Sequence, residues 1–462
     1  MEIARAERGV PGLDLLVHDA VEGRRVLRVG DRIDAGDLEP TLEEGPSDSR
    51  GEHALLWRRM DRTHHIYLVP GFLGFANLGR ITYFGHVGRI LSERLTAAGL
   101  EPRIHIVRTP PTASLPVRAA RVAEVIDATA QRGGAPLHLI GHSSGGLDVR
   151  LLTAPGVGLP TALDVEGLAT RVRTVVTVST PHHGTPLASL FTTLRGQQLL
   201  QLLSLNTIYV LNFGYLPLAA LFWMGSLLVR FGGLIADSNL LDELFGRLLE
   251  DFTVGRRRAV RQLLRDVVRD QALMLQLTPE AMEVFNASVL RRRGIRYGAV
   301  VAQAARPSLR STLGVGIDPA AQVTHALYRA LYRLIAAAPG RDAPRLAAHQ
   351  ARALRRSYRA MPSPDGNDGI VPTRSQAWGR VIHAALADHL DVLGHFRDAA
   401  HDPPHIDWLV TGSGFDRRRF EALWADVARF LVGDARSPSK RRRAAGRPRA
   451  EITKAQRSRG EG

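Results

Sequence analysis

The chain has 462 residues, of which 45% are hydrophobic and 23% are charged, and its formal net charge is +16. This composition excludes a collagen, a coiled coil and a globally disordered chain, and a chain of this length can bury a sizeable core. Cysteine is absent, which excludes disulfides, thiolate metal sites and a cysteine nucleophile.

Residues 1–63 are predicted to form an N-terminal extension. Two apolar runs, Leu13–His18 and Arg25–Val29, predict a hairpin around Glu22-Gly23. The first residues show no cationic stretch followed by an apolar run, which is the pattern of a secretory signal. We therefore expect a cytoplasmic protein, with association with a membrane left open.

From residue 64 onward, short apolar runs alternate with longer amphipathic segments. This alternation predicts an α/β fold with a mostly parallel central sheet and helices on both faces. We expect the core to comprise residues 64–190 and 288–432. The predicted strands are Ile66–Val69, Ile104–Val107, Leu137–Ile140, Val172–Val178, Tyr297–Ala302 and Val381–Leu386, and the clearest helices are Phe84–Ala98 and Pro116–Thr129.

Two Gly-rich turns follow predicted strands in the first half of the core. Leu137–Gly146 contains Gly-His-Ser-Ser-Gly, the G-x-S-x-G pattern that places a serine nucleophile on a sharp strand-to-helix turn. Ser143 is therefore the candidate nucleophile. In such hydrolases an earlier strand-end loop and the residue after the serine supply the amides of the oxyanion hole, which indicates the backbone N–H groups of Phe72 and Ser144.

Residues 191–287 interrupt the alternation and are predicted to form a helical, apolar cap. Residues 196–229 carry no charge, and Tyr209–Val229 is apolar enough to be a candidate membrane span. Asn212 and Pro217 interrupt that run, and it lies between two parts of the same predicted sheet. We favour a cap or lid, with a membrane span or an in-plane anchor as alternatives.

A serine nucleophile of this type needs an acid and then a histidine later in the chain. Asp365 and Asp368 lie in a turn between the last two predicted strands, and His389 and His395 follow the last strand. Asp365-Gly366 is typical of a turn, which favours Asp368 as the acid. His389 is favoured over His395, the alternative base, because it follows the strand sooner.

The last 30 residues, 433–462, are predicted to be a disordered basic tail. From Arg436 onward there are ten basic and two acidic residues, a net charge of +8, so half of the excess charge lies here. We expect this tail to be dispensable for catalysis, and we expect no specific nucleic-acid partner. Peripheral contact with a membrane through the cap or the tail stays open.

Several motifs resemble those of bacterial triacylglycerol lipases of the Pseudomonas and Burkholderia type and related α/β-hydrolase esterases. The resemblance implies Asp368 as the triad acid and His389 as the base. This chain has Pro70-Gly71 where the family usually has His-Gly. The motifs are Val69–Phe75, Leu139–Arg150, Ser179–Pro186, Asn367–Val371 and His389–Asp391.

The resemblance also bears on metals. The family often binds a structural calcium through the Asp of His-Leu-Asp, and this makes Asp391 a weak calcium candidate. The second aspartate that the family uses is expected at residues 346–348, but these are Leu-Ala-Ala. We therefore expect no metal and no cofactor. A cluster of His401, His405 and Asp407 is an alternative metal site, although Pro403-Pro404 between them favours a plain loop.

The combined prediction is a serine esterase or lipase that hydrolyses carboxylic esters of lipophilic acyl chains through a triad and an acyl-enzyme. An acyltransferase or thioesterase would use the same residues. A non-catalytic scaffold that binds a membrane or nucleic acid is the alternative from another class. Asp148 and Arg150 lie on the helix behind the serine, and we expect them to pack or pair there rather than react.

Overall fold

The computed structural model describes residues 62–72, 83–130, 134–213, 246–337 and 344–433. The hairpin predicted at Leu13–His18 and Arg25–Val29 and the predicted basic tail lie outside these residues, as does most of the apolar run Tyr209–Val229. Accordingly, the fold below is that of the predicted core and of the described part of the predicted cap.

Six parallel strands form one sheet in the order β2-β1-β3-β4-β5-β6. Each predicted strand is present. The observed β1, β3, β5 and β6 extend the predicted strands by one to three residues, β4 matches, and β2 begins three residues earlier and ends one residue earlier than predicted. The strands are β1 Thr63–Val69, β2 Glu101–Ile106, β3 Leu137–His142, β4 Val172–Val178, β5 Arg296–Gln303 and β6 Arg380–Leu386. Every residue of β3 is buried, as expected for a parallel strand covered on both faces.

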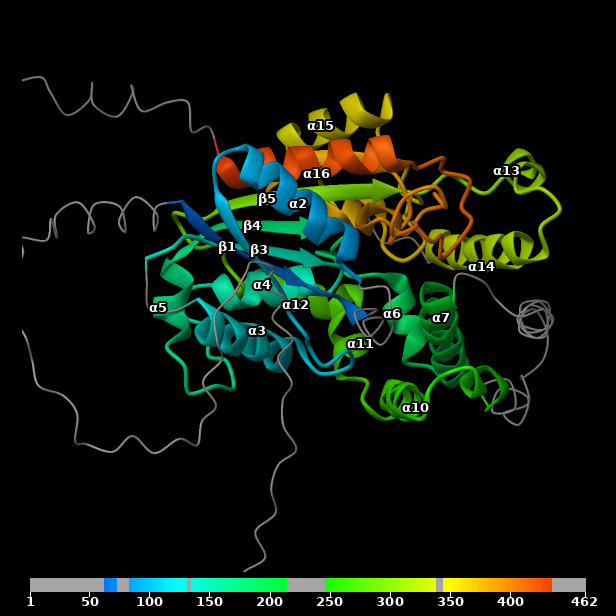
Figure 1. The fold of residues 1–462 in the computed structure, drawn as a ribbon, viewed down its shortest axis with the longest axis horizontal. Coiled ribbons are helices and arrows are strands. Elements are labelled where there is room, and N and C mark those ends of the chain that lie inside the picture. The colour runs from blue at the N-terminus through cyan, green and yellow to red at the C-terminus, as the bar shows by residue number, and fades with distance from the viewer. Residues whose placement is uncertain (1–61, 73–82, 131–133, 214–245, 338–343, 434–462) are drawn as a thin grey trace, which may run out of the picture. The chain divides into compact units, whose positions relative to one another are not determined.

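Helices cover both faces of the sheet (Figure 1). On one face α2 (Gly85–Ala97), α15 (Ala348–Tyr358) and α16 (Arg417–Val432) pack against the sheet, and α2 also packs against α16. The other face carries α3 (Leu115–Thr129), α4 (Gly145–Thr153) and α5 (Val165–Thr170). The predicted α/β class, with a parallel sheet between two helical layers, is confirmed.

Further helices occupy the segments between β4 and β6, and one short helix follows β6. They are α6 Pro186–Phe191, α7 Leu194–Phe213, α10 Val254–Arg269, α11 Ala272–Gln276, α12 Pro279–Ser288, α13 Leu309–Gly314 and α14 Pro319–Ala336, with the short 3-10 helices η2 Thr373–Gln376 and η3 Asp391–Leu393. Helices α6 and α7 lie beyond the ends toward which the strand arrows point (Figure 1). Within the described residues, no helix combines the length and the apolar character that crossing a membrane would require.

Imidazole side chains lie near the starts of β1 and β3, and burial of one of them, His138, makes the stability of the fold sensitive to acid. His138 on β3 contacts the ring of His64 through Nε2 (2.8 Å) and the Thr174 hydroxyl through Nδ1 (2.7 Å). Burial, with a smaller contribution from a charge on His64, lowers the pKa of His138 to about 3. The unfolded chain then binds more protons than the native chain below pH 6.5, so stability falls as the pH drops through that value.

We expect a His138→Gln substitution to reduce this pH dependence. Each such histidine contributes about 1.4 kcal/mol per pH unit to the slope between its unfolded and folded pKa values. Urea unfolding of the wild type and the variant at pH 6.5 and pH 5 measures the difference. His349→Gln, at an exposed position on α15, is the control and should keep the wild-type slope. An unchanged slope in His138→Gln would contradict the prediction.

Candidate active site

Ser143 lies on a sharp turn between β3 and α4. Its φ is +54°, in the left-handed region that L-residues seldom adopt, and the turn permits this only because its neighbours are glycines. A Cβ on Gly141 would lie 2.3 Å from the carbonyl oxygen of Gly145, and a Cβ on Gly145 would lie 2.3 Å from that of Val69. Both small residues of the G-x-S-x-G pattern are therefore required by close backbone approach.

The loop after β1 is packed against this turn. A Cβ on Gly71 would lie 2.5 Å from the Cβ of Ser143 and 3.0 Å from its hydroxyl oxygen. Phe72 follows directly and is buried. The backbone N–H of Ser144, at the N-terminus of α4, has no acceptor among the described residues. The two backbone segments predicted to donate to an oxyanion thus flank the Ser143 hydroxyl, and Pro70 takes the place of the family histidine without separating them.

Asp368 and His389 meet in the buried interior. Nδ1 of His389 lies 2.8 Å from Oδ2 of Asp368, and both side chains are at most 1% exposed. Since a carboxylate only accepts, Nδ1 carries the proton and Nε2 has the free lone pair. The sequence analysis favoured this pair, and the structure joins it.

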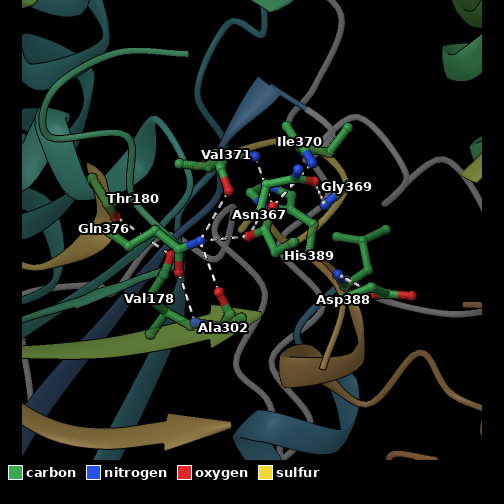
Figure 2. A network of polar contacts seen from close by, with 12 residues as sticks. Val178, Thr180, Ala302, Asn367, Gly369, Ile370, Val371, Gln376, Asp388 and His389 are labelled. Atoms are coloured by element: carbon green, nitrogen blue, oxygen red, sulfur yellow. Dashed lines mark hydrogen bonds and ion pairs between the residues drawn. The ribbon is translucent and has the colours of Figure 1, made fainter. Parts of the chain in front are cut away.

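Gln376, which the sequence analysis did not single out, makes hydrogen bonds within the polar network that also contains His389 (Figure 2). Its Nε2 donates to Oδ2 of Asp368 (3.1 Å) and to the carbonyls of Ala302 and Val371. The other oxygen, Oδ1, accepts the backbone amides of Ile370 (3.0 Å) and Val371 (2.7 Å). Both carboxylate oxygens are thus used by fixed donors, which sets the direction in which Oδ2 faces His389.

A second hydrogen-bond chain connects the Ser143 turn to His389. His142, the residue before Ser143, donates from Nε2 to the backbone carbonyl of His389 (2.8 Å) and accepts at Nδ1 from the Tyr83 hydroxyl (2.6 Å). Burial, followed by the charge of His389, lowers the pKa of His142 well below its usual value, so its ring stays neutral. The rings of His142 and His389 are 4.7 Å apart. His389 therefore lies beside the Ser143 turn, although among the described residues the Ser143 hydroxyl makes no hydrogen bond, to His389 or elsewhere.

The competing residues make other contacts. His395, the alternative base, donates from Nε2 to the carbonyl of Tyr83 (3.2 Å), and its buried Nδ1 has no partner among the described residues. Asp365 forms an ion pair with the exposed Arg306 (3.2 Å). Of the candidate acids and bases from the sequence, only Asp368 and His389 make an acid–imidazole contact within the described residues.

Two buried carboxylates and one half-buried carboxylate surround the segment that carries His389. Oxygen atoms of Asp388, Asp391 and Asp407 lie within 4.8 Å of one another, and Oδ2 of Asp388 is buried without a partner among the described residues. Burial raises the pKa of Asp388 to about 7 and raises those of Asp391 and Asp407, helped by the charge of Asp388. Such an oxygen cluster fits a hard cation such as calcium, which would brace this segment.

This cluster differs from the expectation drawn from the sequence. The sequence analysis named Asp391 as a weak calcium candidate, and it expected no calcium because no second aspartate lies at the spacing seen in the family. The structure supplies the other carboxylates from Asp388 and, across a longer loop, from Asp407. Asp407 was grouped with His401 and His405 in the sequence analysis, but those histidines meet His86 instead.

Asp148 and Arg150 pack behind the nucleophile, as predicted. Asp148 forms a buried ion pair with Arg118 of α3, at 2.8 Å between Nη2 and Oδ2. Nη2 of Arg118 also donates to the carbonyl of Pro70 (2.8 Å). Arg150 contacts His182 through Nη1 (2.9 Å) and covers the ring of Trp378. Asp148 and Arg150 have structural contacts, and Arg118 additionally fixes the loop that leads to Phe72.

We expect Arg118→Met to lower the free energy of unfolding by about 3–5 kcal/mol, because it leaves the Asp148 carboxylate buried without its cation. Arg121→Met on the same helix is the control. Its ion pair with Glu124 is about half exposed on both sides and should be worth at most about 1 kcal/mol. Urea unfolding followed by circular dichroism measures both. Equal losses in the two variants would contradict this account.

Comparison with known proteins gives a resemblance in fold. No protein-family model matches the chain, and no curated protein matches it in sequence. Among solved structures it is similar to EstA from Clostridium botulinum (19% identity, 80% of this chain and 87% of that chain, TM-score 0.44) and to lipase 1 from Pelosinus fermentans (18%, 80% and 98%, 0.45). Staphylococcus hyicus lipase is also similar (14%, 80% and 95%, 0.41). The chain resembles bacterial lipases and esterases. The predicted class, a parallel α/β sheet with helices on both faces, rests on the fold itself.

Proposed function

We propose that the protein is a serine hydrolase that cleaves carboxylic esters of lipophilic acyl chains, with Ser143 as nucleophile, His389 as base and Asp368 as its orienting acid. The observation that supports this most strongly is the buried Asp368–His389 hydrogen bond of 2.8 Å, held beside a serine with a left-handed backbone. A turn with a purely structural role does not require both a buried acid–imidazole hydrogen bond and a serine with a left-handed backbone at the same edge of the sheet.

The mechanism follows from the proton positions. Nδ1 of His389 donates to Asp368, so Nε2 accepts the proton of Ser143 as its oxygen attacks the ester carbonyl carbon. The negative oxygen of the tetrahedral intermediate accepts the amides of Phe72 and Ser144, each worth about 3–4 kcal/mol in comparable sites. The carbonyl carbon–oxygen bond to the alcohol then breaks, and His389 returns the proton to the departing alcohol. Water repeats these steps and releases the acid.

The lipophilic preference is inferred from the described part of the predicted cap. Helix α7 follows the Ser179–Pro186 loop and α6, and it carries a row of buried apolar residues that includes Leu199, Leu203 and Ile208. Helix α10 packs against it, with Gln201 donating to the carbonyl of Leu264 (3.1 Å). An apolar cap of this kind suits an acyl chain better than a charged acid.

A hydrolysis assay with p-nitrophenyl acetate, octanoate and palmitate tests the proposal. We expect turnover, and at least about tenfold higher kcat/KM for octanoate than for acetate. The octanoyl chain is longer than the acetyl chain, and burial of only two of its additional methylenes, at about 0.8 kcal/mol of binding free energy each, gives that ratio. A preference for acetate would refute the lipophilic assignment, and absence of turnover on all three esters, with the protein folded by circular dichroism, would refute the hydrolase assignment.

A further inference from the structure

Three histidines from two distant segments converge at the start of α2. His86 lies in the first turn of α2, and His401 and His405 lie in the loop between η3 and α16. One ring nitrogen of each lies within 4.8 Å of one ring nitrogen of the other two. His86 is 6% exposed and His405 is 4% exposed. None of the three takes part in the proposed ester chemistry.

Backbone carbonyls determine which ring nitrogens are available. Nδ1 of His405 lies 2.6 Å from the carbonyl oxygen of Gly394, and Nδ1 of His401 lies 2.8 Å from that of Pro403. A carbonyl only accepts, so Nδ1 of both rings carries the proton and Nε2 of both has a free lone pair. Histidines that bind metals show this arrangement, with the second ring nitrogen donating to a backbone carbonyl or carboxylate.

His86 completes the set. Its imidazole makes no hydrogen bond with any described residue, although it stacks on the ring of His405 at a centroid distance of 3.8 Å. Burial, helped by the charges of His405 and other neighbours, lowers its pKa to about 3. Burial also lowers the pKa of His405. The rings of His86 and His405 are therefore neutral at physiological pH, the form in which imidazole binds a metal.

The surrounding backbone holds this cluster together. Gly394 packs against His86 so closely that a Cβ there would lie 2.9 Å from the Cβ of His86. Nη1 of Arg89, one turn along α2, donates to the carbonyl of Asp402 (2.7 Å). These contacts tie α2 to the loop on both sides of the histidines. To bind one ion, the stacked rings of His86 and His405 must turn so that a nitrogen of each points at it.

A pocket of about 510 Å³ adjoins the three rings. Its wall includes Glu93 and Glu421 as well as Arg89 and Arg417. The pocket leaves room for a water molecule as a fourth ligand, as in zinc sites built from three histidines. The two carboxylates offset part of the positive charge that a divalent ion would bring near Arg89, Arg94 and Arg417.

We propose that His86, His401 and His405 bind one zinc ion, with the fourth position open to the pocket. Imidazole ligands favour zinc and its neighbours in the transition series over calcium or magnesium, which bind through oxygen. Tetrahedral zinc bonds of about 2.0–2.1 Å place ligand nitrogens roughly 3.4 Å apart, so the rings must approach by about an ångström. The ion would fasten the loop that follows the triad histidine to α2, and the site is independent of the proposed esterase activity.

Zinc titration of the untagged full-length chain, after removal of metals with a chelator, tests this proposal. We expect one zinc ion per chain, measured by competition with a chromophoric chelator, together with a rise in Tm on zinc addition. Cobalt in place of zinc should give visible d–d absorption, which reports histidine coordination independently of any activity. His401 is the ligand to replace because it is the most exposed of the three, and His401→Gln should leave the fold intact.

The matched control is His349→Gln, at an exposed histidine on α15. His401→Gln should weaken zinc binding by more than the roughly 10–100-fold that loss of an outer-sphere partner costs, and the zinc-dependent rise in Tm should disappear. His349→Gln should bind as the wild type does. Failure of the wild type to bind one zinc ion at micromolar concentration, or equal binding by His401→Gln and the wild type, would overturn the proposal.

Discussion

Replacing Ser143 with alanine should lower kcat on p-nitrophenyl octanoate by about 10⁴-fold or more. Loss of the nucleophile in a serine triad costs up to roughly 10⁶-fold, with the remainder supplied by oxyanion stabilisation and binding. The substitution removes one oxygen at a half-buried position and keeps the left-handed backbone, so the fold should persist. Steady-state hydrolysis, with circular dichroism to confirm folding, measures the effect.

Covalent labelling gives a second measurement of the same prediction. A fluorophosphonate probe should attach once per wild-type chain, on the peptide that contains Ser143, and should not label Ser143→Ala. Ser144→Ala serves as the neighbouring control, because Ser144 contributes its backbone amide and its buried hydroxyl has no partner among the described residues. Full activity of Ser143→Ala, or labelling at another serine, would remove the basis of the proposed function.

His389→Ala should cause a loss of similar size, because without the imidazole neither the attack nor the departure of the alcohol has a proton carrier. His389 bonds to Asp368 at 2.8 Å, whereas His395 donates to a backbone carbonyl. We therefore expect a loss of at least about 10⁴-fold in kcat for His389→Ala. His395→Ala should lose far less, apart from any loss of folded protein.

The two histidine variants are compared at equal concentrations of folded protein, since both side chains are buried. Added imidazole should partly restore the activity of His389→Ala by entering the space left by the ring, and it should have no effect on the wild type. A His389→Ala variant that stays active while His395→Ala is inactive would transfer the role of base to His395 and leave Ser143 as the nucleophile.

Much of the fold follows from local patterns along the chain. The run Val172–Val178 is apolar and β-branched, and it forms β4 with the predicted bounds. The G-x-S-x-G segment predicted a strand, a turn and a helix, because only small residues tolerate the backbone approach seen at Gly141 and Gly145. Asp368 and His389 were predicted because parallel strands end at one edge of the sheet, where their side chains can meet.

Other parts of the site have no local signal. Gln376 lies in a short 3-10 helix, and nothing in its sequence neighbourhood distinguishes it from a surface glutamine before the fold brings it to Asp368. The same applies to Tyr83, which reaches His142 across 59 residues. These partners are set by how the loops cross the sheet edge, and one buried hydrogen bond leaves no periodic pattern in a sequence.

By itself the sequence predicted the parallel sheet and the sharp turn at Ser143, since both depend on residue types at short spacing, and it indicated the segments that hold Asp368 and His389. Only the tertiary structure decided which acidic and imidazole groups share a site. It placed Asp407 with Asp388 and Asp391 and placed His86 with His401 and His405. Residues as far apart as 86 and 405 become neighbours through the packing of α2 beside the loop after β6, and that packing depends on the whole core.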